Sequence, residues 1–193
     1  MTRLTGSQSH SDPFNLAEQL GQIDLPPVHL WNPELCGDMD LYIDRNGVWF
    51  YMGSPIGRHR LVKLLSSVMR READGEYYLV TPIEKLRIQV ADAPFLAVEI
   101  EAEGEGEEQR LLFRTNVNDV VAADNDHPIR ITEDPTSGEP SPYLMVRDGL
   151  EALLSRPVFY RLVDLSVERQ QQMSATLGVW SSGIFFSLRA PGK

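Results

Sequence analysis

The sequence is poor in residues that cross-link a small fold or carry it into a membrane. Its single cysteine, Cys36, allows no disulfide within the chain, and such cysteine usage is typical of a reducing compartment. No apolar run approaches the roughly 18 residues that a membrane span needs. Residues 1–13 are rich in Ser and Thr and lack the apolar centre of a signal peptide. We therefore expect a disordered leader over residues 1–13 and a cytoplasmic protein.

Positive charge is also scarce. The chain has 18 Lys and Arg against 28 Asp and Glu, which gives a formal net charge of −10 at pH 7. Nucleic-acid binding depends on clustered Lys and Arg, and anionic membrane surfaces attract the same residues. We therefore expect neither nucleic acid nor a membrane as a partner.

Motifs for catalysis and metal binding are missing as well. Ser54 lacks the flanking glycines of a nucleophile elbow, and residues 53–58 lack the lysine of a phosphate loop. Cys36 has no neighbours at zinc-ligand spacing. The Asp-Asn-Asp run at 124–126 opens like a calcium loop but meets Pro128 before the required Gly and Glu. The expectation is a non-enzymatic protein with no catalytic residues, no metal and no cofactor.

The material for a hydrophobic core is present. Hydrophobic residues make up 42% of the 193 residues and charged residues 24%, the proportions of an ordinary globular protein. Apolar spacing predicts a helix over residues 14–23. Asn46-Gly47 lies between alternating segments at 40–44 and 48–52, and this pattern predicts a hairpin.

A longer helix is predicted directly after this hairpin. Ser54 is a suitable N-cap and Pro55 a suitable first helical residue, so the helix should run over residues 55–71. Residues 76–81 read as the next strand, which Pro82 ends. These elements form the predicted N-terminal α+β domain, residues 14–84.

The remainder, residues 85–193, is predicted to consist mainly of short strands. The segments expected to be strands are 85–90, 95–101, 109–115, 120–121, 127–131, 143–146, 157–163, 176–180 and 184–188. A short helix is expected after Arg147-Asp148, with Leu150, Leu153 and Leu154 buried. The strand–helix–strand order of 48–81 thus recurs at 143–163, and this recurrence favours two related units.

One basic cluster stands out in this acidic chain. Arg58, His59 and Arg60 lie in the first turns of the predicted helix, where the macrodipole already places partial positive charge, and Lys63 follows. Arg147 repeats this arrangement before the second predicted helix.

Two explanations remain open for this cluster. The charge is balanced either by internal carboxylates such as Asp38, Asp40 and Asp44, or by a ligand phosphate or carboxylate at the helix start. Trp31 and Tyr143 could stack a planar ring beside the arginines, although strand aromatics are more often part of a core. The predicted ligand-binding residues are Arg58, Arg60, Arg147, Tyr143, Trp31 and Lys63.

Several segments together resemble DUF1285, a bacterial family of proteins of unknown function. The matching segments are 31–33, 36–38, 44–65, 78–84, 92–95, 142–147, 149–152, 178–180 and Phe186. The resemblance implies a duplicated α+β architecture whose C-terminal half is similar to pleckstrin-homology-like folds. It also implies a role in signalling through a nucleotide-like ligand at the domain interface, and it supplies no catalytic residues.

These observations together predict both a fold and a function. The fold is α+β, with two small related domains of antiparallel strands plus one helix each, the C-terminal one a pleckstrin-homology-like barrel or sandwich. The function is that of a non-enzymatic regulatory protein binding a small anionic ligand between its domains. The alternative is a protein-interaction module that uses an exposed strand edge and the aromatic hairpin at 176–188, with no small ligand.

Overall fold

The computed structural model describes residues 25–134, 138–171 and 174–189; the predicted leader and the predicted helix at 14–23 lie outside these ranges. In chain order the elements are η2 (Val28–Leu30), β1 (Leu35–Ile43), β2 (Trp49–Tyr51), β3 (Ser54–Pro55), α1 (His59–Ser67), β4 (Met69–Arg71), β5 (Tyr77–Val80), β6 (Lys85–Val90), β7 (Phe95–Glu103), η3 (Gly106–Glu108), β8 (Arg110–Thr115), β9 (Val120–Ala122), β10 (Ile129–Glu133), β11 (Pro140–Arg147), β12 (Leu150–Leu154), α2 (Arg156–Asp164), β13 (Val167–Gln171), β14 (Ser174–Ser181) and β15 (Ile184–Ser187).

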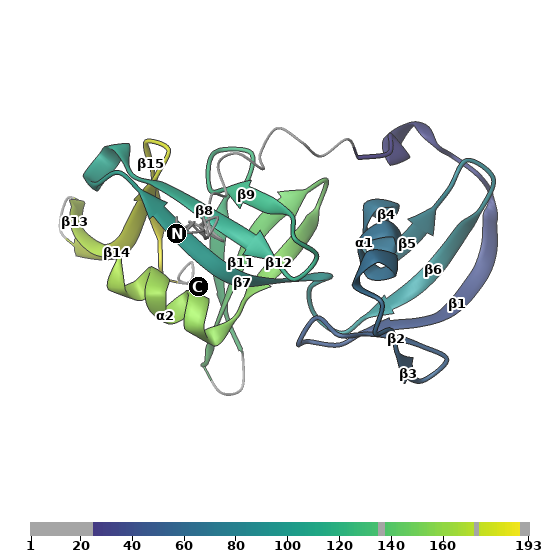
Figure 1. Cartoon of the computed structure of the whole chain (residues 1–193). Coiled ribbons are helices and arrows are strands. Elements are labelled where there is room, and N and C mark those ends of the chain that lie inside the picture. Colours follow the sequence, from purple (N-terminus) through teal and green to yellow (C-terminus); the bar gives the residue numbers. More distant parts are fainter. Residues whose placement is uncertain (1–24, 135–137, 172–173, 190–193) are drawn as a thin grey trace, which may run out of the picture.

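Two six-stranded sheets of the same topology make up the body of the molecule (Figure 1). The first has the order β3-β2-β1-β6-β5-β4. The second, taken from its β9 edge, has the order β9-β8-β7-β12-β11-β10, which is the same order with every strand six places later. In each sheet two three-stranded antiparallel meanders meet at a central parallel pair, β1 with β6 and β7 with β12. The expected α+β fold of two related domains is confirmed.

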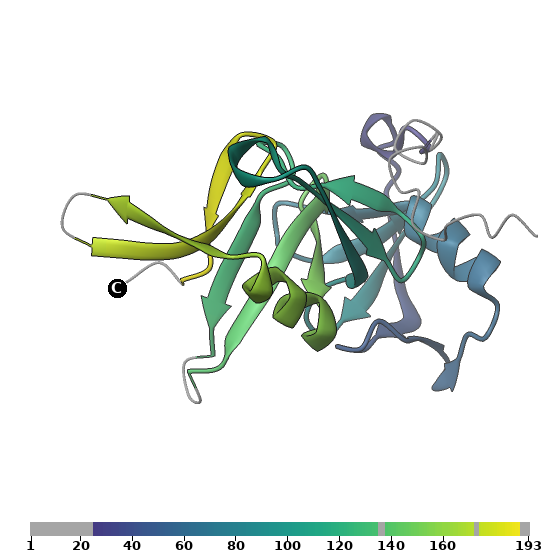
Figure 2. The ribbon, with the colours of Figure 1, turned by 60° about the vertical axis from the view of Figure 1, so that its left-hand side comes forward.

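The C-terminal domain is completed by α2 and a small third sheet. Its six-stranded sheet is curled into a half-barrel, and α2 contacts β7 and β14. The third sheet has the order β13-β14-β15, and its β13–β14 ribbon extends away from the body (Figure 2). This curled sheet with its adjoining helix fits the expected pleckstrin-homology-like shape.

A continuous hydrophobic core runs through both domains. Its largest fully buried side chains include Trp49 from the first domain and Phe95 and Phe113 from the second. The connection between β6 and β7 consists of residues 91–94, and Ala93 within it is buried. The domains therefore share packing as well as a linker.

The hairpin at Asn46-Gly47 is confirmed, with β1 and β2 antiparallel on either side of it. Asp44 fixes the turn by accepting hydrogen bonds from the backbone N–H groups of Asn46 at 2.9 Å and Val48 at 2.8 Å. Gly47 has φ +75°, and a Cβ there would lie 2.6 Å from Nδ2 of Asn116 in the second domain. Glycine is therefore required at this contact between the domains.

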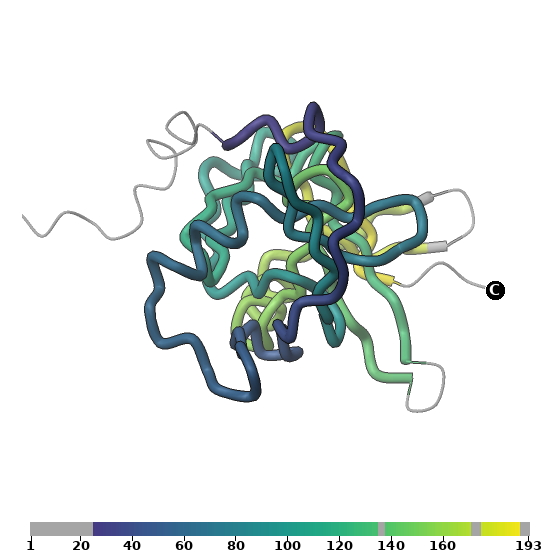
Figure 3. The backbone as a smooth tube through the Cα atoms, turned by 90° about the vertical axis from the view of Figure 1, so that its right-hand side faces the viewer, coloured from purple at the N-terminus to yellow at the C-terminus, as the bar shows by residue number. Residues whose placement is uncertain are grey.

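The predicted helix over residues 55–71 is wrong at both ends. Ser54 and Pro55 form β3, which pairs with β2 across a two-residue turn at Met52-Gly53. Both turn residues have positive φ, +49° and +73°, as a type I′ turn requires. The chain then loops away from the sheets (Figure 3), α1 begins at His59, and residues 69–71 form β4.

Around residues 150–163 the structure has a strand where a helix is predicted, and a helix where a strand is predicted. Leu150–Leu154 is strand β12 and not a helix, while residues 157–163 lie in helix α2 and not in a strand. Asp148 and Gly149, with φ +43° and +78°, form a two-residue hairpin turn that returns the chain antiparallel to β11. Ser155 then precedes a helix that carries proline in its first turn, a favoured arrangement.

Two further differences concern β6 and β13. β6 pairs with both β1 and β5, so the first sheet continues to residue 90, past the expected domain boundary at 84/85. Residues 170–171, expected in a polar connection, lie in β13. The aromatic hairpin of β14 and β15 is confirmed.

Candidate functional site

Arg147 forms a tie between the two domains. Its Nη1 lies 2.5 Å from Oδ2 of Asp119, and its Nη2 donates to the backbone carbonyl of Ser66 at 3.0 Å. The guanidinium also lies 4.8 Å from the ring centre of Phe95. The side chains of Arg147 and Asp119 are only 14% and 7% exposed. The charge and the hydrogen bonds of Arg147 are thus met by groups of the protein itself. Through these contacts Arg147 links the C-terminal end of α1 to the second domain.

Arg58 and Arg60 lie at the other end of α1, and Lys63 lies in its middle. All three are exposed, and within the described residues they line neither of the two cavities reported below. Arg60 is about 9 Å along the helix axis from Ser66, at about 1.5 Å per residue. The structure therefore does not bring these cations together with Arg147 in one pocket.

Tyr143 and Trp31 also make separate contacts. The hydroxyl of Tyr143 donates to Oδ1 of Asp92 at 2.8 Å, and the Arg130 guanidinium lies 4.3 Å from its ring centre. Burial, together with the hydrogen bond to Asp92, raises the pKa of Tyr143. Trp31 lies in the first domain, where its carbonyl accepts a hydrogen bond from Arg70 at 2.7 Å. Neither ring stacks beside Arg58 or Arg60 to form the predicted platform.

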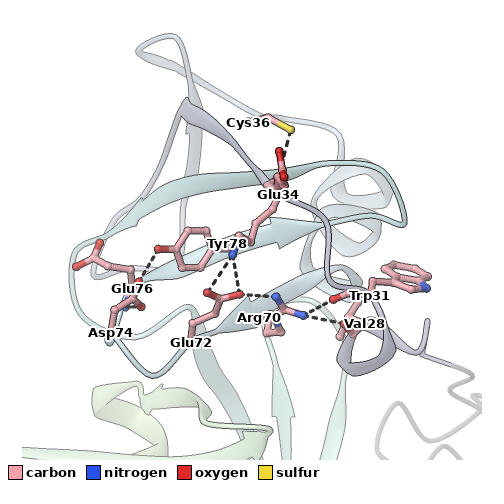
Figure 4. Close-up of polar contacts among 10 residues, drawn as sticks. Val28, Trp31, Glu34, Cys36, Arg70, Glu72, Asp74, Glu76 and Tyr78 are labelled. Atoms are coloured by element: carbon pink, nitrogen blue, oxygen red, sulfur yellow. Dashed lines mark hydrogen bonds and ion pairs between the residues drawn. The ribbon is translucent and has the colours of Figure 1, made fainter.

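Another polar network lies around Arg70 (Figure 4). Arg70 donates to the carbonyls of Val28 and Trp31 and forms an ion pair with Glu72, whose other oxygen lies 3.2 Å from Nζ of Lys85. Burial alone would raise the pKa of Glu72, but hydrogen bonds from Arg70 and Lys85 hold that pKa below its ordinary value. The network fastens η2 onto β4, and we assign it a structural role.

Tyr78 lies beside this network and is also satisfied internally. Its hydroxyl donates to Oδ2 of Asp74 at 2.6 Å, and this hydrogen bond raises the pKa of Tyr78 to about 12. The same bond lowers the pKa of Asp74. A tyrosine that holds its proton so firmly is unsuited to act as a general base at neutral pH.

The larger cavity has a volume of about 510 Å³ and lies between the β1–β2 turn of the first domain and α2 of the second. Its polar lining includes Arg45, Asn46, Ser141 and Arg156, and its apolar lining includes Leu96, Leu153, Phe159 and Tyr160. This volume is within the range of about 300–1,000 Å³ that small-molecule sites occupy. The cavity therefore combines residues of both domains.

Arg45 is held at the edge of this cavity by both domains. Its Nε lies 3.0 Å from Oδ2 of Asp92, and its Nη2 donates to Oγ of Ser141 at 2.9 Å. Asn116 secures the turn that carries Arg45 by donating to the Gly47 carbonyl at 2.9 Å. The Arg45 side chain is nevertheless 60% exposed. It is thus oriented by protein contacts while still accessible to a ligand.

The N-terminus of α2 opens onto the same cavity. Ser155 makes no side-chain capping bond, and the first turn of the helix contains no acidic residue. Arg156 adds a cation, which lies 3.3 Å from Oε1 of Glu139 in an exposed ion pair. Uncapped N–H groups and the helix dipole favour an anion at this position.

The second cavity, of about 400 Å³, is lined by Arg147 and Asp119 together with apolar residues of β9. Its polar groups are largely paired with one another. Besides the Arg147–Asp119 pair, Nδ1 of His127 lies 2.9 Å from Oδ1 of Asp124. It offers a ligand fewer available charges than the larger cavity.

Arg45, Ser141 and Arg156 are not among the residues predicted from sequence. Arg45 lies in a turn, Ser141 near the start of β11 and Arg156 at the start of α2, with no motif around them. Residues from both domains must meet to form the cavity. The one local signal was Ser155 before Pro157, which marks the start of α2 and therefore a helix N-terminus.

No group of three or more His, Cys, Asp or Glu side chains suited to a metal ion occurs among residues 25–134, 138–171 and 174–189. In that same part of the chain, no helix has the length and apolar character to cross a membrane.

Comparisons with known proteins agree on one family. Family models match residues 26–93 ("Domain of unknown function (DUF1285), N-terminal domain") and 94–188 ("Protein of unknown function (DUF1285), C-terminal domain"). No curated protein shows a significant match to the sequence.

Two solved structures are similar to this chain. A DUF1285 protein from Silicibacter pomeroyi DSS-3 is 48% identical, with 90% of this chain and 92% of that chain covered and a TM-score of 0.80. A DUF1285 protein from Shewanella baltica OS155 is 29% identical, with 65% and 91% covered and a TM-score of 0.51. Both domains and the long match at 48% identity show that the chain belongs to the DUF1285 family.

Proposed function

We propose that this protein is a non-enzymatic regulatory protein that binds a small anionic, nucleotide-like ligand in the cavity between its domains. One observation carries the proposal. Arg45 from the first domain and the uncapped start of α2 from the second open onto the same cavity of about 510 Å³.

The lining suits a ligand with an anionic end and a planar end. A phosphate would accept hydrogen bonds from the Arg45 guanidinium and from the first-turn amides of α2. The rings of Phe159 and Tyr160, with the side chain of Leu96, form the apolar part of the lining against which a base could pack. Such a ligand would contact both domains at once, which is a basis for a regulatory signal.

The carboxylate of Glu139 does not prevent anion binding. Its ion pair with Arg156 is exposed, at 67% and 81% for the two side chains. Exposed pairs contribute about 0–1 kcal/mol, so a ligand phosphate could replace Glu139 at small energetic loss. Asp92 is already engaged by Arg45 and Tyr143.

Calorimetric titration with inorganic phosphate and with a panel of nucleoside mono-, di- and triphosphates tests the proposal. Arg45→Ala and Arg156→Ala should each weaken binding of the tightest nucleotide about tenfold or more, because each removes a charge-assisted hydrogen bond. Arg161→Ala is the matched control, since Arg161 lies on α2 but does not line the cavity. Equal affinity in all four proteins, or no binding by any nucleotide, would contradict the assignment.

The alternative of an interaction module without a small ligand receives little support from the aromatic hairpin. Trp180 and Phe185 pack edge to face at 5.3 Å, and the Arg169 guanidinium lies 5.0 Å and 5.4 Å from their ring centres. Arg169 thus covers the aromatic pair. A protein partner remains a prediction, and the outer face of α1 is a better candidate for its binding surface.

A further inference from the structure

The outer face of α1 carries three cations that form no ion pair among the residues that the structure describes. Within the described residues, the side chains of Arg58, Arg60 and Lys63 make none of the hydrogen bonds, ion pairs or ring contacts found elsewhere. The cations that do form ion pairs with carboxylates are Arg45, Arg70, Lys85, Arg87, Arg110, Arg114, Arg130, Arg147 and Arg156. In a chain of net charge −10, a cluster of cations on one short helix that has no ion pair within the described part of the chain is a distinct surface feature.

Two exposed leucines lie beside these cations. Leu61 and Leu64 are three residues apart and therefore adjacent on the helix surface, as are Arg60 and Lys63. Leu64 is 62% exposed, whereas Val62 on the opposite face is buried. Single exposed leucines are ordinary. Here an apolar stripe runs alongside a basic stripe, and we call Arg60, Leu61, Lys63 and Leu64 the α1 face.

Arg58 and Arg60 lie at the N-terminal end of α1, where positive charge is unfavourable. The first turn of α1 contains no acidic residue, and Arg58 at the N-cap makes no side-chain capping bond. Cations at a helix N-terminus oppose the macrodipole, with an effect of about 0.3–1 kcal/mol each. His59 contacts Asn118, which is uncharged. No carboxylate of the described residues offsets this arrangement by ion pairing, and carboxylates of a bound partner would.

We propose that the α1 face is a docking site for an acidic amphipathic helix of a partner protein, with Asp or Glu beside Leu, Ile, Val or Met along one side. Charge complementarity supports an acidic partner, and the leucine stripe supports apolar side chains next to its carboxylates. Nucleic acids and anionic membranes would meet the same cations, but the net charge of −10 repels their continuous negative surfaces.

The size of the face sets the strength of the interaction. α1 has nine residues, about 13 Å at about 1.5 Å per residue, so it can engage two to three turns of a partner helix. Interfaces this small belong to the weak, transient class. The α1 face does not line the interdomain cavity, so the proposal is independent of ligand binding there.

Fluorescence anisotropy with labelled synthetic peptides tests the proposal. The first peptide carries Glu and Leu at helical spacing over about four turns, and the second is a scrambled peptide of the same composition. The full chain should bind the first peptide with a dissociation constant in the micromolar range and the second about tenfold more weakly. Binding should weaken as salt is added, because the face is exposed.

Matched variants separate this face from general surface effects. Lys63→Glu should weaken binding of the amphipathic peptide about tenfold, whereas Arg161→Glu makes the same charge change on α2 and should have little effect. Leu64→Ser should weaken binding of the amphipathic peptide as well. Ile83→Ser is its control and should have little effect, because Ile83 is of similar size and 80% exposed but lies outside the α1 face. Arg60→Gln is a second variant that removes charge without introducing repulsion.

Several outcomes would overturn the proposal. These are equal binding of the ordered and scrambled peptides, equal effects of the Lys63 and Arg161 variants, or tighter binding to phosphatidylserine vesicles or single-stranded DNA than to the peptide. Because all substituted positions are exposed, the thermal midpoints of the variants should match that of the wild type.

Discussion

The two helices differ although the sheets beside them share one topology. Each helix has nine residues. α1 lies within the first unit, between β3 and β4, whereas α2 follows the last strand of the second unit, β12. The strand order β3-β2-β1-β6-β5-β4 is thus repeated without its helix.

The sheets and the helices therefore have separate roles in this molecule. The sheets supply the shared core, which includes Trp49, Phe95 and Phe113. The helices present their surfaces differently, because the start of α2 opens onto the interdomain cavity while the outer face of α1 is free of ion pairs among the described residues. Both proposed sites therefore involve the elements that the repeat does not reproduce.

Removing the tie between α1 and the second domain should have the largest effect. Arg147→Ala leaves the buried carboxylate of Asp119 without its cation and the Ser66 carbonyl without its donor. Loss of one partner of a buried ion pair lowers the free energy of unfolding by about 3 kcal/mol or more. Urea unfolding measures this change. The exposed Arg87–Asp38 pair supplies the control, since solvent screens that pair and Arg87→Ala should change the free energy of unfolding far less.

A double variant distinguishes the ion pair from packing. Asp119→Asn in the Arg147→Ala background removes the unpaired charge, so it should recover part of the lost stability. If Arg147→Ala unfolds no more readily than Arg87→Ala, the contact does not tie α1 to the second domain.

Loss of stability at low pH is the next largest expected effect. Glu72 has a pKa below its ordinary value of 4.5, since the bonds from Arg70 and Lys85 outweigh the effect of burial. Its contribution to stability is therefore full above that ordinary value and is lost as the pH falls through the folded-state pKa. The thermal midpoint of the wild type should fall between about pH 6 and about pH 3, and Glu72→Gln should reduce that fall.

The second domain offers a parallel case for the same measurement. Burial would raise the pKa of Asp124, but its hydrogen bonds with His127 lower that pKa. Asp124→Asn should remove a similar share of the acid sensitivity. A wild-type thermal midpoint that does not change with pH would contradict both assignments.

The smallest expected effect comes from two related turns. Met52-Gly53 and Asp148-Gly149 both have positive φ at each residue. Methionine is poorly suited to this conformation, while Asn and Asp tolerate it. Met52→Asn should raise the free energy of unfolding by about 0.5–1 kcal/mol, and Asp148→Met should lower it by a similar amount. Thermal unfolding of both variants checks the opposite signs; a loss of stability with Met52→Asn would show that the methionine side chain is needed.

The sequence predicted the fold class and the turns that rest on local chemistry. Asn46-Gly47 specified its hairpin because both residues suit the turn and Asp44 can bond its amides. The helix and strand around residues 150–163 were reversed, since a Leu-rich segment such as 150–154 has helical propensity that pairing with β7 and β11 overrides.

The sites were harder to predict because they depend on contacts between distant residues. Nothing near Arg147 in the sequence shows that Asp119 neutralises it or that Ser66 receives its second bond. Arg45 precedes the Asn46-Gly47 turn, and its position at a cavity depends on Ser141 in the other domain. By contrast, the sequence alone shows the cluster of cations on α1, because neighbouring residues define it.

The central parallel pair of each sheet also determines how the chain must fold. Each three-stranded meander is local, but Leu35 must find Lys85, and Phe95 must find Ala152, before the two meanders of a sheet join. Loop-closure entropy opposes these distant pairings, so they are expected to be slow relative to hairpin formation. The four meanders are the units expected to form first, and joining them in pairs is the step expected to limit the rate of folding.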